Sequence, residues 1–208
     1  MPRAMTDRPA DLAAHKAATR KTAAATRAAL NPAPGASRRA AGHALAAIAA
    51  VRGARTVAAY LPMRGEIDPQ PLMLALVGLG YVVAAPVIQG PGLPLLFRRW
   101  TPGAATRNGP LGAPTLIEGA EVEPDVVLAP LLAWDPDGWR LGYGGGYYDR
   151  SIAALRDRRP LLALGFAFAG QRLDCVPRGP RDARLDAIVT EEGVIETGNA
   201  EAGATRRA

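Results

Sequence analysis

The residues best suited to chemistry lie in one short segment, Trp139 to Arg150, which reads WRLGYGGGYYDR. Four glycines, at positions 142, 144, 145 and 146, precede a helix that we predict from about Tyr147 to Leu155. Glycines permit a positive φ and let backbone N–H groups approach a ligand, and the N-terminus of a helix favours an anion. Arg140 can clamp a phosphate with its planar guanidinium, and Asp149 offers oxygen ligands to Mg²⁺. The segment therefore predicts a phosphate-binding loop.

The pattern alone leaves an alternative, a Gly-rich turn packed tightly between a strand and a helix. The segment lacks the GK[ST] of a Walker A loop, and it is not a G-x-G-x-x-G that follows a strand with a clear ribose-binding acid. The generic motif therefore indicates a phosphate site without identifying the nucleotide or the reaction.

A second cationic feature lies near the N-terminus, where an Ala-rich helix is predicted from Asp11 to Leu30. At about 100° per residue, Lys16, Arg20 and Arg27 fall within about 40° of one another and form one basic face. Such a face is often simply solvated, and this reading stays open on the pattern alone. A second Ala-rich helix is predicted from about Ser37 to Val51, with Ser37 as its N-cap.

The rest of the chain predicts the scaffold that holds these residues. Short apolar runs, among them TVAAYL, YVVAAP, PDVVLAP and LLALGFAF, alternate with turn residues and helical stretches. Near-continuous apolar strands are typical of a sheet buried on both faces. We predict an α/β fold with one domain, a central and mostly parallel sheet flanked by helices, and the Ala-rich helices at the N-terminus. The domain is expected over residues 11–195, with a disordered segment at 1–10 and a flexible tail at 196–208.

Composition narrows the class of protein. The 208 residues are 49% hydrophobic and 21% charged, as in globular proteins, and no apolar run approaches the roughly 18 residues of a membrane span. The N-terminus has no apolar segment typical of a secretory signal, and Cys175 is the only cysteine, so we expect a cytoplasmic protein. The net charge of +6 comes from scattered arginines with few aromatic residues, which favours an anionic small molecule over nucleic acid.

Larger segments carry a family resemblance. LAWDPDGWRLGYGGGYYDR resembles the signature of the 5-formyltetrahydrofolate cyclo-ligase family, also called methenyltetrahydrofolate synthetases. AAYLPMRGEID and LGFAFAGQRLDCVPRGPRDARLDAIVTEEG resemble further family segments in the same order, so the resemblance extends from Lys16 to Gly193. It implies an enzyme that uses ATP and Mg²⁺ to convert 5-formyltetrahydrofolate, with or without a polyglutamate tail, into 5,10-methenyltetrahydrofolate, ADP and phosphate. We also expect a monomer, and the scattered charges and short apolar runs predict no nucleic-acid or membrane partner.

The resemblance also implies residue roles for the nucleotide and the metal. Lys16 and Arg20 match an ATP-binding Lys-x-x-Leu-Arg element in which Thr19 replaces the leucine, and Lys16, Arg140 and Tyr147 are the implied catalytic residues. Asp149 and Asp182 match the metal ligands, although Asp186 competes with Asp182, and Arg178 and Arg181 depart from the family pattern beside it. The implied ATP-binding residues are Lys16, Arg20, Arg140, Leu141, Gly142, Tyr143, Gly144, Gly145, Gly146, Tyr147 and Tyr148.

For the folate, the resemblance implies Leu61, Glu66, Tyr143 and Tyr147. A carboxylate such as Glu66 suits the N–H donors of a pterin ring, and the tyrosines can stack on a flat ligand. From the residues alone, Glu66 can equally be a solvated loop carboxylate and the tyrosines can be core. Gln171 occupies another recurrent family position, with no role that the sequence assigns.

Other functions remain open at this point. A cyclo-ligase-like protein could act on another substrate, and a non-catalytic RNA-associated module could use the same scaffold. A sugar-phosphate isomerase of related architecture is disfavoured because no acid/base pair accompanies the Gly-rich loop. The two histidines, His15 and His43, both fall in the predicted N-terminal helices, away from that loop.

Overall fold

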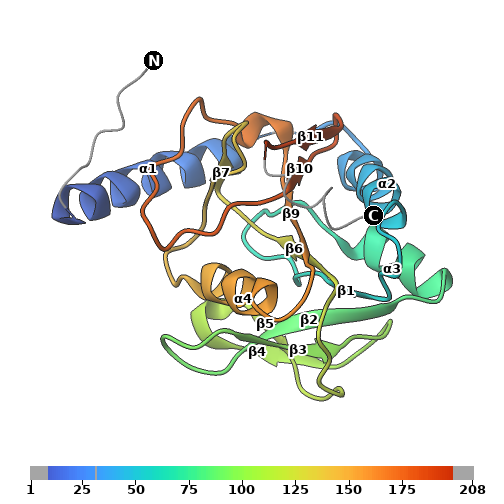
Figure 1. Ribbon diagram of the computed structural model, residues 1–208. Helices are drawn as coiled ribbons and strands as arrows, with labels where there is room; N and C mark the ends of the chain where they lie inside the picture. Colours follow the sequence, from blue (N-terminus) through green and yellow to red (C-terminus); the bar gives the residue numbers. More distant parts are fainter. Residues whose placement is uncertain (1–8, 31, 199–208) are drawn as a thin grey trace.

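The computed structural model describes residues 9–30 and 32–198, and Figure 1 shows their arrangement. Four α-helices occur in this part of the chain: α1 (Pro9–Ala29), α2 (Ala36–Ala49), α3 (Gln70–Gly78) and α4 (Tyr147–Arg156). Short 3₁₀ turns, η1 (Pro110–Gly112) and η2 (Ala169–Gln171), lie in connecting loops. None of the helices within the described ranges is long and apolar enough to cross a membrane.

A seven-stranded sheet forms the centre of the fold, in the order β11-β10-β9-β6-β1-β2-β3. Its five inner strands are parallel, whereas β3 and β11 pair antiparallel at the two edges. The strands of this sheet are β1 (Thr56–Ala58), β2 (Val82–Ile88), β3 (Leu95–Arg99), β6 (Val126–Ala129), β9 (Leu162–Phe166), β10 (Ala187–Val189) and β11 (Val194–Glu196). The predicted mostly parallel α/β fold is therefore confirmed.

Two small antiparallel pairs lie outside the main sheet. β4 (Thr106–Asn108) pairs with β5 (Pro114–Leu116), and β7 (Ala133–Trp134) pairs with β8 (Arg140–Leu141). The second pair leads directly into the Gly-rich segment, so it determines where that segment lies.

Both faces of the sheet are buried, as the apolar strands require. On one face, α2 and α3 pack on alternate strand residues such as Val57 and Leu128, and Ile48 of α2 is fully buried there. On the other face, α4 buries Ile152 and Leu155 against the intervening strand residues. Helix α1 covers neither face of the main sheet, because it packs on η2 and on the β7–β8 hairpin (Figure 1).

Some predicted boundaries need correction. Helix α1 begins at Pro9 rather than Asp11, so residues 9 and 10 leave the predicted disordered segment, and residues 1–8 lie outside the described part. Proline is tolerated in the first turn of a helix because its missing N–H would have no intrahelical acceptor there. Helix α2 begins at Ala36 after Gly35 in a left-handed conformation, and Ser37 is not the cap; its hydroxyl accepts a hydrogen bond from the Asp68 N–H.

The predicted flexible tail is wrong at its first residues. Val194–Glu196 forms β11 along the edge of the sheet, and Thr197 is buried with its hydroxyl donating to the Leu185 carbonyl at 2.7 Å. The strand is only three residues long and pairs with β10 on one side only, so its sequence gave no clear strand pattern. The structure describes this segment as far as Gly198, and residues 199–208 lie outside the described part.

The strand order also indicates where a ligand should bind. In chain order the parallel strands lie as second, first, third, fourth and fifth across the sheet, so the direction of winding reverses between β1 and β6. In open α/β sheets, ligands bind beyond the carboxyl ends of the strands at such a switch point. The loops that follow β1 and β6 are those that carry Glu66 and the Gly-rich segment.

Candidate active site

One cleft of about 420 Å³ lies at this switch point. Its walls come from α1, the loop after β1, the Gly-rich segment with the start of α4, and the loop around Asp182. Every residue that the sequence assigned to ATP, folate or metal lines it: Lys16, Arg20, Leu61, Glu66, the ten residues from Arg140 to Asp149, and Asp182. The structure thus brings together segments that are up to 166 positions apart in the chain.

The β7–β8 hairpin holds the Gly-rich segment in place. The buried Asp135 carboxylate in its turn accepts hydrogen bonds from the Trp139 N–H at 3.0 Å and the Val176 N–H at 2.8 Å. Gly138 completes the turn at φ 88°, where an added Cβ would lie 2.7 Å from the Leu185 carbonyl oxygen. This local structure explains why the DPDG sequence precedes the glycines.

Within the segment, the glycines have distinct roles. Gly144 and Gly146 adopt φ values of 101° and 66°, so the predicted positive φ is confirmed at these positions. Gly145 is needed for space, because an added Cβ would lie 2.5 Å from the Tyr147 ring. Gly146 is the N-cap of α4, whose first N–H groups have no intrahelical acceptor and lie beside the cleft.

The basic face of α1 contacts this segment rather than solvent. Lys16 forms an ion pair with Asp182, and the Arg20 Nε donates to the Gly142 carbonyl at 2.9 Å. Arg27 is only 5% exposed, and its guanidinium donates to the Tyr143 hydroxyl at 2.5 Å. The solvated reading of this face is therefore wrong for Arg27, which the sequence had not assigned to the site.

The carboxylates assigned to the metal lie in the cleft wall and already have cationic partners. Asp149 Oδ1 accepts hydrogen bonds from Arg140 at 2.7 Å and from the Ala183 N–H at 3.0 Å. Arg140 also donates to the Ala183 carbonyl, and burial lowers the pKa of its guanidinium while Asp149 opposes that shift. Asp182 pairs with Lys16 and accepts from the Gly179 N–H at 2.6 Å.

Asp186 has a different environment from Asp182. Its carboxylate pairs with Arg156 at 2.8 Å and accepts from the Ala163 N–H at 2.7 Å, which ties α4 and β9 to the start of β10. The residue is not among those that line the cleft. Of the two candidates for the second metal ligand, the structure brings Asp182 to the site. Within the described ranges, no group of three or more His, Cys, Asp or Glu residues is placed to hold a metal ion.

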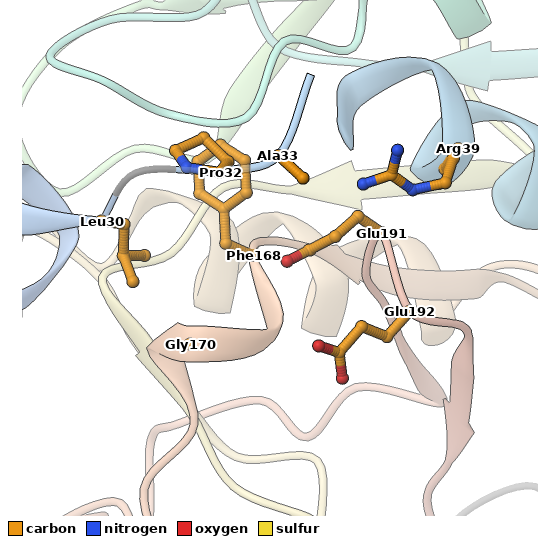
Figure 2. A pocket seen from close by; sticks show the side chains of 8 residues that line it. All are labelled: Leu30, Pro32, Ala33, Arg39, Phe168, Gly170, Glu191 and Glu192. Atoms are coloured by element: carbon orange, nitrogen blue, oxygen red, sulfur yellow. The ribbon is translucent and has the colours of Figure 1, made fainter. Parts of the chain in front are cut away.

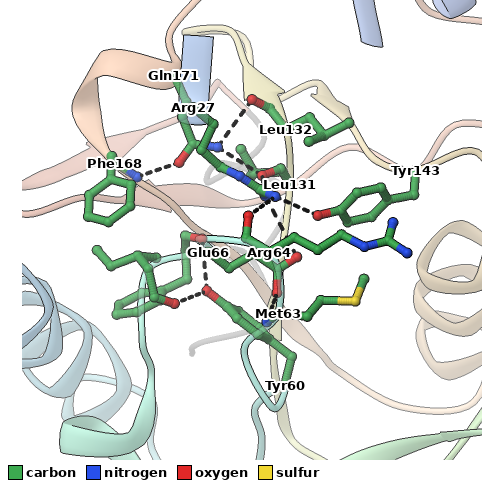
Figure 3. A network of polar contacts seen from close by, with 12 residues as sticks. Arg27, Tyr60, Met63, Arg64, Glu66, Leu131, Leu132, Tyr143, Phe168 and Gln171 are labelled. Carbon is green, nitrogen blue, oxygen red and sulfur yellow. Dashed lines mark hydrogen bonds and ion pairs between the residues drawn. The ribbon is translucent and has the colours of Figure 1, made fainter. Parts of the chain in front are cut away.

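Glu66 lines the cleft and belongs to a buried polar network (Figure 3). Its Oε2 accepts from the Met63 N–H at 2.9 Å, and its side chain is 3% exposed, so it is not a solvated loop carboxylate. Burial raises the pKa of Glu66, while the Met63 N–H and the nearby Arg27 lower it. Burial and the Glu66 charge likewise raise the pKa of Tyr60, whose hydroxyl donates to the Ile67 carbonyl at 2.7 Å.

Of the remaining assigned residues, some line the cleft and others stabilise the fold around it. Tyr147 lies beneath the Arg150 guanidinium, 5.2 Å from its ring centroid, and Leu61 packs against the main core. Tyr148 packs between two core clusters, and burial raises the pKa of its hydroxyl. Gln171 is buried and supports the fold: its amide donates to the Leu131 and Leu132 carbonyls, and its oxygen accepts from the Phe168 N–H (Figure 3).

Sequence reasoning missed part of the cleft wall. Its apolar side is formed by residues at strand ends and in the η1 turn, including Pro86, Ile88, Leu95, Leu111 and Pro114. No motif marks these residues: Pro86 and Ile88 lie in β2, Leu95 and Pro114 begin β3 and β5, and Leu111 lies in η1. An apolar wall opposite the charged loop suits a flat aromatic ligand.

A second cavity, of about 280 Å³, lies between the α1–α2 connection and η2 (Figure 2). None of the assigned residues lines it. Of its charged residues, Arg39 donates to the Pro34 carbonyl and Glu191 accepts from the Ala169 N–H, so both stabilise local loops. The first cleft is therefore the better candidate for chemistry.

Comparisons with known proteins identify the family of this chain. The model of the 5-formyltetrahydrofolate cyclo-ligase family matches residues 12–191. The chain is 33% identical over 150 residues to the 5-formyltetrahydrofolate cyclo-ligase of Mycolicibacterium smegmatis, covering 68% of this chain and 76% of the relative. It is 34% identical over 150 residues to that of Escherichia coli K12, covering 69% and 81%.

A solved structure supports the same conclusion at the level of the fold. The 5,10-methenyltetrahydrofolate synthetase of Aquifex aeolicus superposes with a TM-score of 0.68 at 28% identity, covering 88% of this chain and 93% of that one. Together with the family match over residues 12–191, this likeness confirms the resemblance that the Gly-rich segment first indicated. The chain belongs to the 5-formyltetrahydrofolate cyclo-ligase family.

Proposed function

We propose that this cyclo-ligase binds ATP with Mg²⁺ and 5-formyltetrahydrofolate side by side in the cleft and converts the folate into 5,10-methenyltetrahydrofolate. The observation that carries the proposal is the meeting, in one cleft, of a phosphate-type loop with cationic helix residues and a buried carboxylate beside an apolar wall. The first set suits a polyphosphate, and the second suits a pterin.

The nucleotide half is formed by α1 and the Gly-rich segment. Lys16 and Arg20 bring positive charge to the loop that runs from Gly142 to Gly146, and the N-terminus of α4 adds backbone donors. Such donors bind phosphates through the helix dipole and their unpaired N–H groups. The γ-phosphate is expected at this end of the cleft, with Arg140 and Tyr147 as further contacts.

The carboxylate set fits a magnesium ion that is completed by the nucleotide. Mg²⁺ usually takes one or two protein carboxylates together with substrate phosphates and water. Asp149 and Asp182 line the same cleft and are the ligands we propose, with Arg140 and Lys16 released from them toward phosphate oxygens. When bound, the ion neutralises charge on the phosphates.

The folate half is formed by the loop after β1 and by Tyr143. Glu66 accepts hydrogen bonds from N–H groups of the pterin ring. Leu61 and Tyr147 pack on the flat part of the substrate. This assignment is supported by the buried Oε1 of Glu66, which has no hydrogen-bond partner within the described structure. A buried acceptor of this kind costs free energy unless a ligand supplies the donor.

The chemistry follows from the poor leaving ability of a formyl oxygen. The N5-formyl oxygen attacks the γ-phosphorus, the bond to the β-phosphate oxygen breaks, and ADP leaves. The N10 nitrogen then attacks the carbon of the resulting imidate phosphate, its proton is lost, and the C–O bond breaks to release inorganic phosphate. The protein contributes positioning and charge neutralisation, so no serine, cysteine or histidine nucleophile is needed.

The test is the appearance of the methenyltetrahydrofolate absorbance when purified protein is mixed with 5-formyltetrahydrofolate, ATP and MgCl₂. The signal should require both ATP and Mg²⁺. Asp149→Asn should reduce it by about 100-fold or more, since losing electrostatic stabilisation at a phosphoryl group costs several kcal/mol. Asp157→Asn is the matched control, because Asp157 ends the same helix and is exposed.

The alternative outcomes separate the proposed activity from that of a cyclo-ligase-like protein with another substrate. ATP binding without any methenyl product would retain the nucleotide site and assign another acceptor to the cleft. A signal that persists in Asp149→Asn at the level of Asp157→Asn would reject the metal assignment.

A further inference from the structure

Arg27 is the most thoroughly enclosed cation that the cleft mechanism does not use. Its Nη1 donates to the Leu131 carbonyl at 3.3 Å, and its Nη2 donates to the Arg64 carbonyl at 2.8 Å and to the Tyr143 hydroxyl at 2.5 Å. Its side chain is 4% exposed. One guanidinium from α1 therefore joins the loop after β1, the loop after β6 and the Gly-rich segment, as Figure 3 shows.

The same guanidinium lies beside Glu66. Arg27 Nη1 is 3.7 Å from Glu66 Oε1, close enough for strong Coulombic attraction but too far for a hydrogen bond. The other oxygen, Oε2, is occupied by the Met63 N–H. Oε1 is therefore a buried acceptor that has a cation beside it but no hydrogen-bond donor.

We propose that Arg27 is a positioning residue for the folate: it fixes the loop that carries Glu66 and places a cation beside Oε1, which stays available to N–H donors of the pterin. The proposal rests on the function proposed above and adds a residue to it. Truncating Arg27 should therefore affect the folate before it affects the nucleotide.

Because Arg27 lies on α1, it also links this helix to the loop that carries Glu66. Lys16 and Arg20 lie on the same face of this helix, two to three turns earlier, and contact Asp182 and the Gly142 carbonyl. The helix that carries the proposed phosphate ligands is thus fastened at its other end to the folate loop. The proposed contacts to the nucleotide and to the folate loop therefore share one helix.

The charges around Glu66 determine how its protonation should respond. Arg27 reaches it from α1, Arg64 from its own loop, and Tyr143 from the Gly-rich segment, and each of them lowers the pKa that burial raises. The Tyr60 and Tyr148 hydroxyls are also electrostatically coupled to it, and its charge raises their pKa values. Removing the cation of Arg27 leaves burial less opposed, so the pKa of Glu66 should rise further.

The experiment compares Arg27→Gln, Arg27→Lys and the control Lys21→Gln in the methenyl assay over a range of pH. Lys21 lies on the same helix and is exposed, so it reports any general effect of charge on α1. In Arg27→Gln we expect the KM for 5-formyltetrahydrofolate to rise about tenfold while the KM for ATP stays within about twofold, a size typical of directly coupled residues. The acidic limb of kcat/KM for the folate should move to higher pH.

Arg27→Lys keeps the charge but loses the planar fork that reaches three acceptors. It should raise the KM for the folate with the acidic limb near its wild-type position. In a Glu66→Gln background, Arg27→Gln should not move the limb further, because the titrating carboxylate is gone. A residue that only stabilised the fold would lower the melting temperature without moving the limb.

Two results would overturn the proposal. One is an acidic limb in Arg27→Gln that coincides with that of Lys21→Gln. The other, decisive if Arg27→Gln does not fold, is a wild-type KM for the folate in Arg27→Lys. Failure of the wild-type protein to form any methenyl product would instead reject the proposed function itself, so the two failures are distinguishable.

Discussion

Replacing Gly144 by alanine tests how the Gly-rich loop and α1 depend on each other. Gly144 has a φ of 101°, and an added Cβ would lie 3.2 Å from Cζ of Arg20. A non-glycine residue at such a φ costs about 1–2 kcal/mol. The Arg20 guanidinium must also shift by a few tenths of an ångström, which weakens its 2.9 Å hydrogen bond to the Gly142 carbonyl and costs about 1 kcal/mol.

We therefore expect Gly144→Ala to lower the free energy of unfolding by about 2–3 kcal/mol, measured by urea denaturation. Because Arg20 is a proposed phosphate contact, the KM for ATP should rise about tenfold, equivalent to about 1.4 kcal/mol. The KM for the folate should change less. Both constants come from initial rates of methenyl formation.

Gly142→Ala is the matched control from the same loop. No atom lies within 4 Å of its ideal Cβ position, and its φ is not in the left-handed region. Its stability should stay within about 0.5 kcal/mol of the wild type. If Gly144→Ala unfolded at the same urea concentration as Gly142→Ala and kept the wild-type KM for ATP, the backbone requirement at Gly144 and the proposed role of Arg20 in ATP binding would be refuted.

Two further predictions concern stability. Gly165→Ala should destabilise the protein by about 1–3 kcal/mol, because the added Cβ would lie 2.7 Å from Ile188 Cδ1 in a packed core. Gly42→Ala in α2 should instead stabilise it by about 0.5–1 kcal/mol, because no atom lies within 4 Å of the added Cβ. Both values come from the same urea titrations. Glu66 has a pKa raised above 4.5 by burial, so its contribution to stability is present below that pH and is lost as the pH rises through the folded-state pKa. The unfolding free energy of the wild type minus that of Glu66→Gln should consequently fall as the pH rises, and a pH-independent difference would contradict the buried position of this carboxylate.

The scaffold was predictable because its signals are local. Apolar runs such as VVLA and LALGF identify buried strands without reference to the rest of the chain, and the glycines before Tyr147 identify the start of α4. Resemblance over ordered segments then placed the assigned residues, and the structure brings all of them to one cleft.

The features that the sequence did not predict depend on distant partners. Arg27 is buried only because Tyr143, Arg64 and Leu131 surround it, and these lie 37 to 116 positions away. The Ser37 hydroxyl accepts a hydrogen bond from the Asp68 N–H instead of capping α2, and the three-residue edge strand β11 pairs with β10 alone. No local pattern encodes such contacts, since each is decided by tertiary packing.

The central claim, that the formyl oxygen is activated by phosphorylation, can be tested by following that oxygen. 5-Formyltetrahydrofolate labelled with ¹⁸O in the formyl group would be converted with unlabelled ATP and MgCl₂ in unlabelled water, and the released phosphate would be analysed by mass spectrometry. Transfer of the label to inorganic phosphate, with one phosphate formed per methenyl product, is the expected result. Unlabelled phosphate accompanying methenyltetrahydrofolate would contradict the mechanism, because the oxygen would then have left the folate by another route.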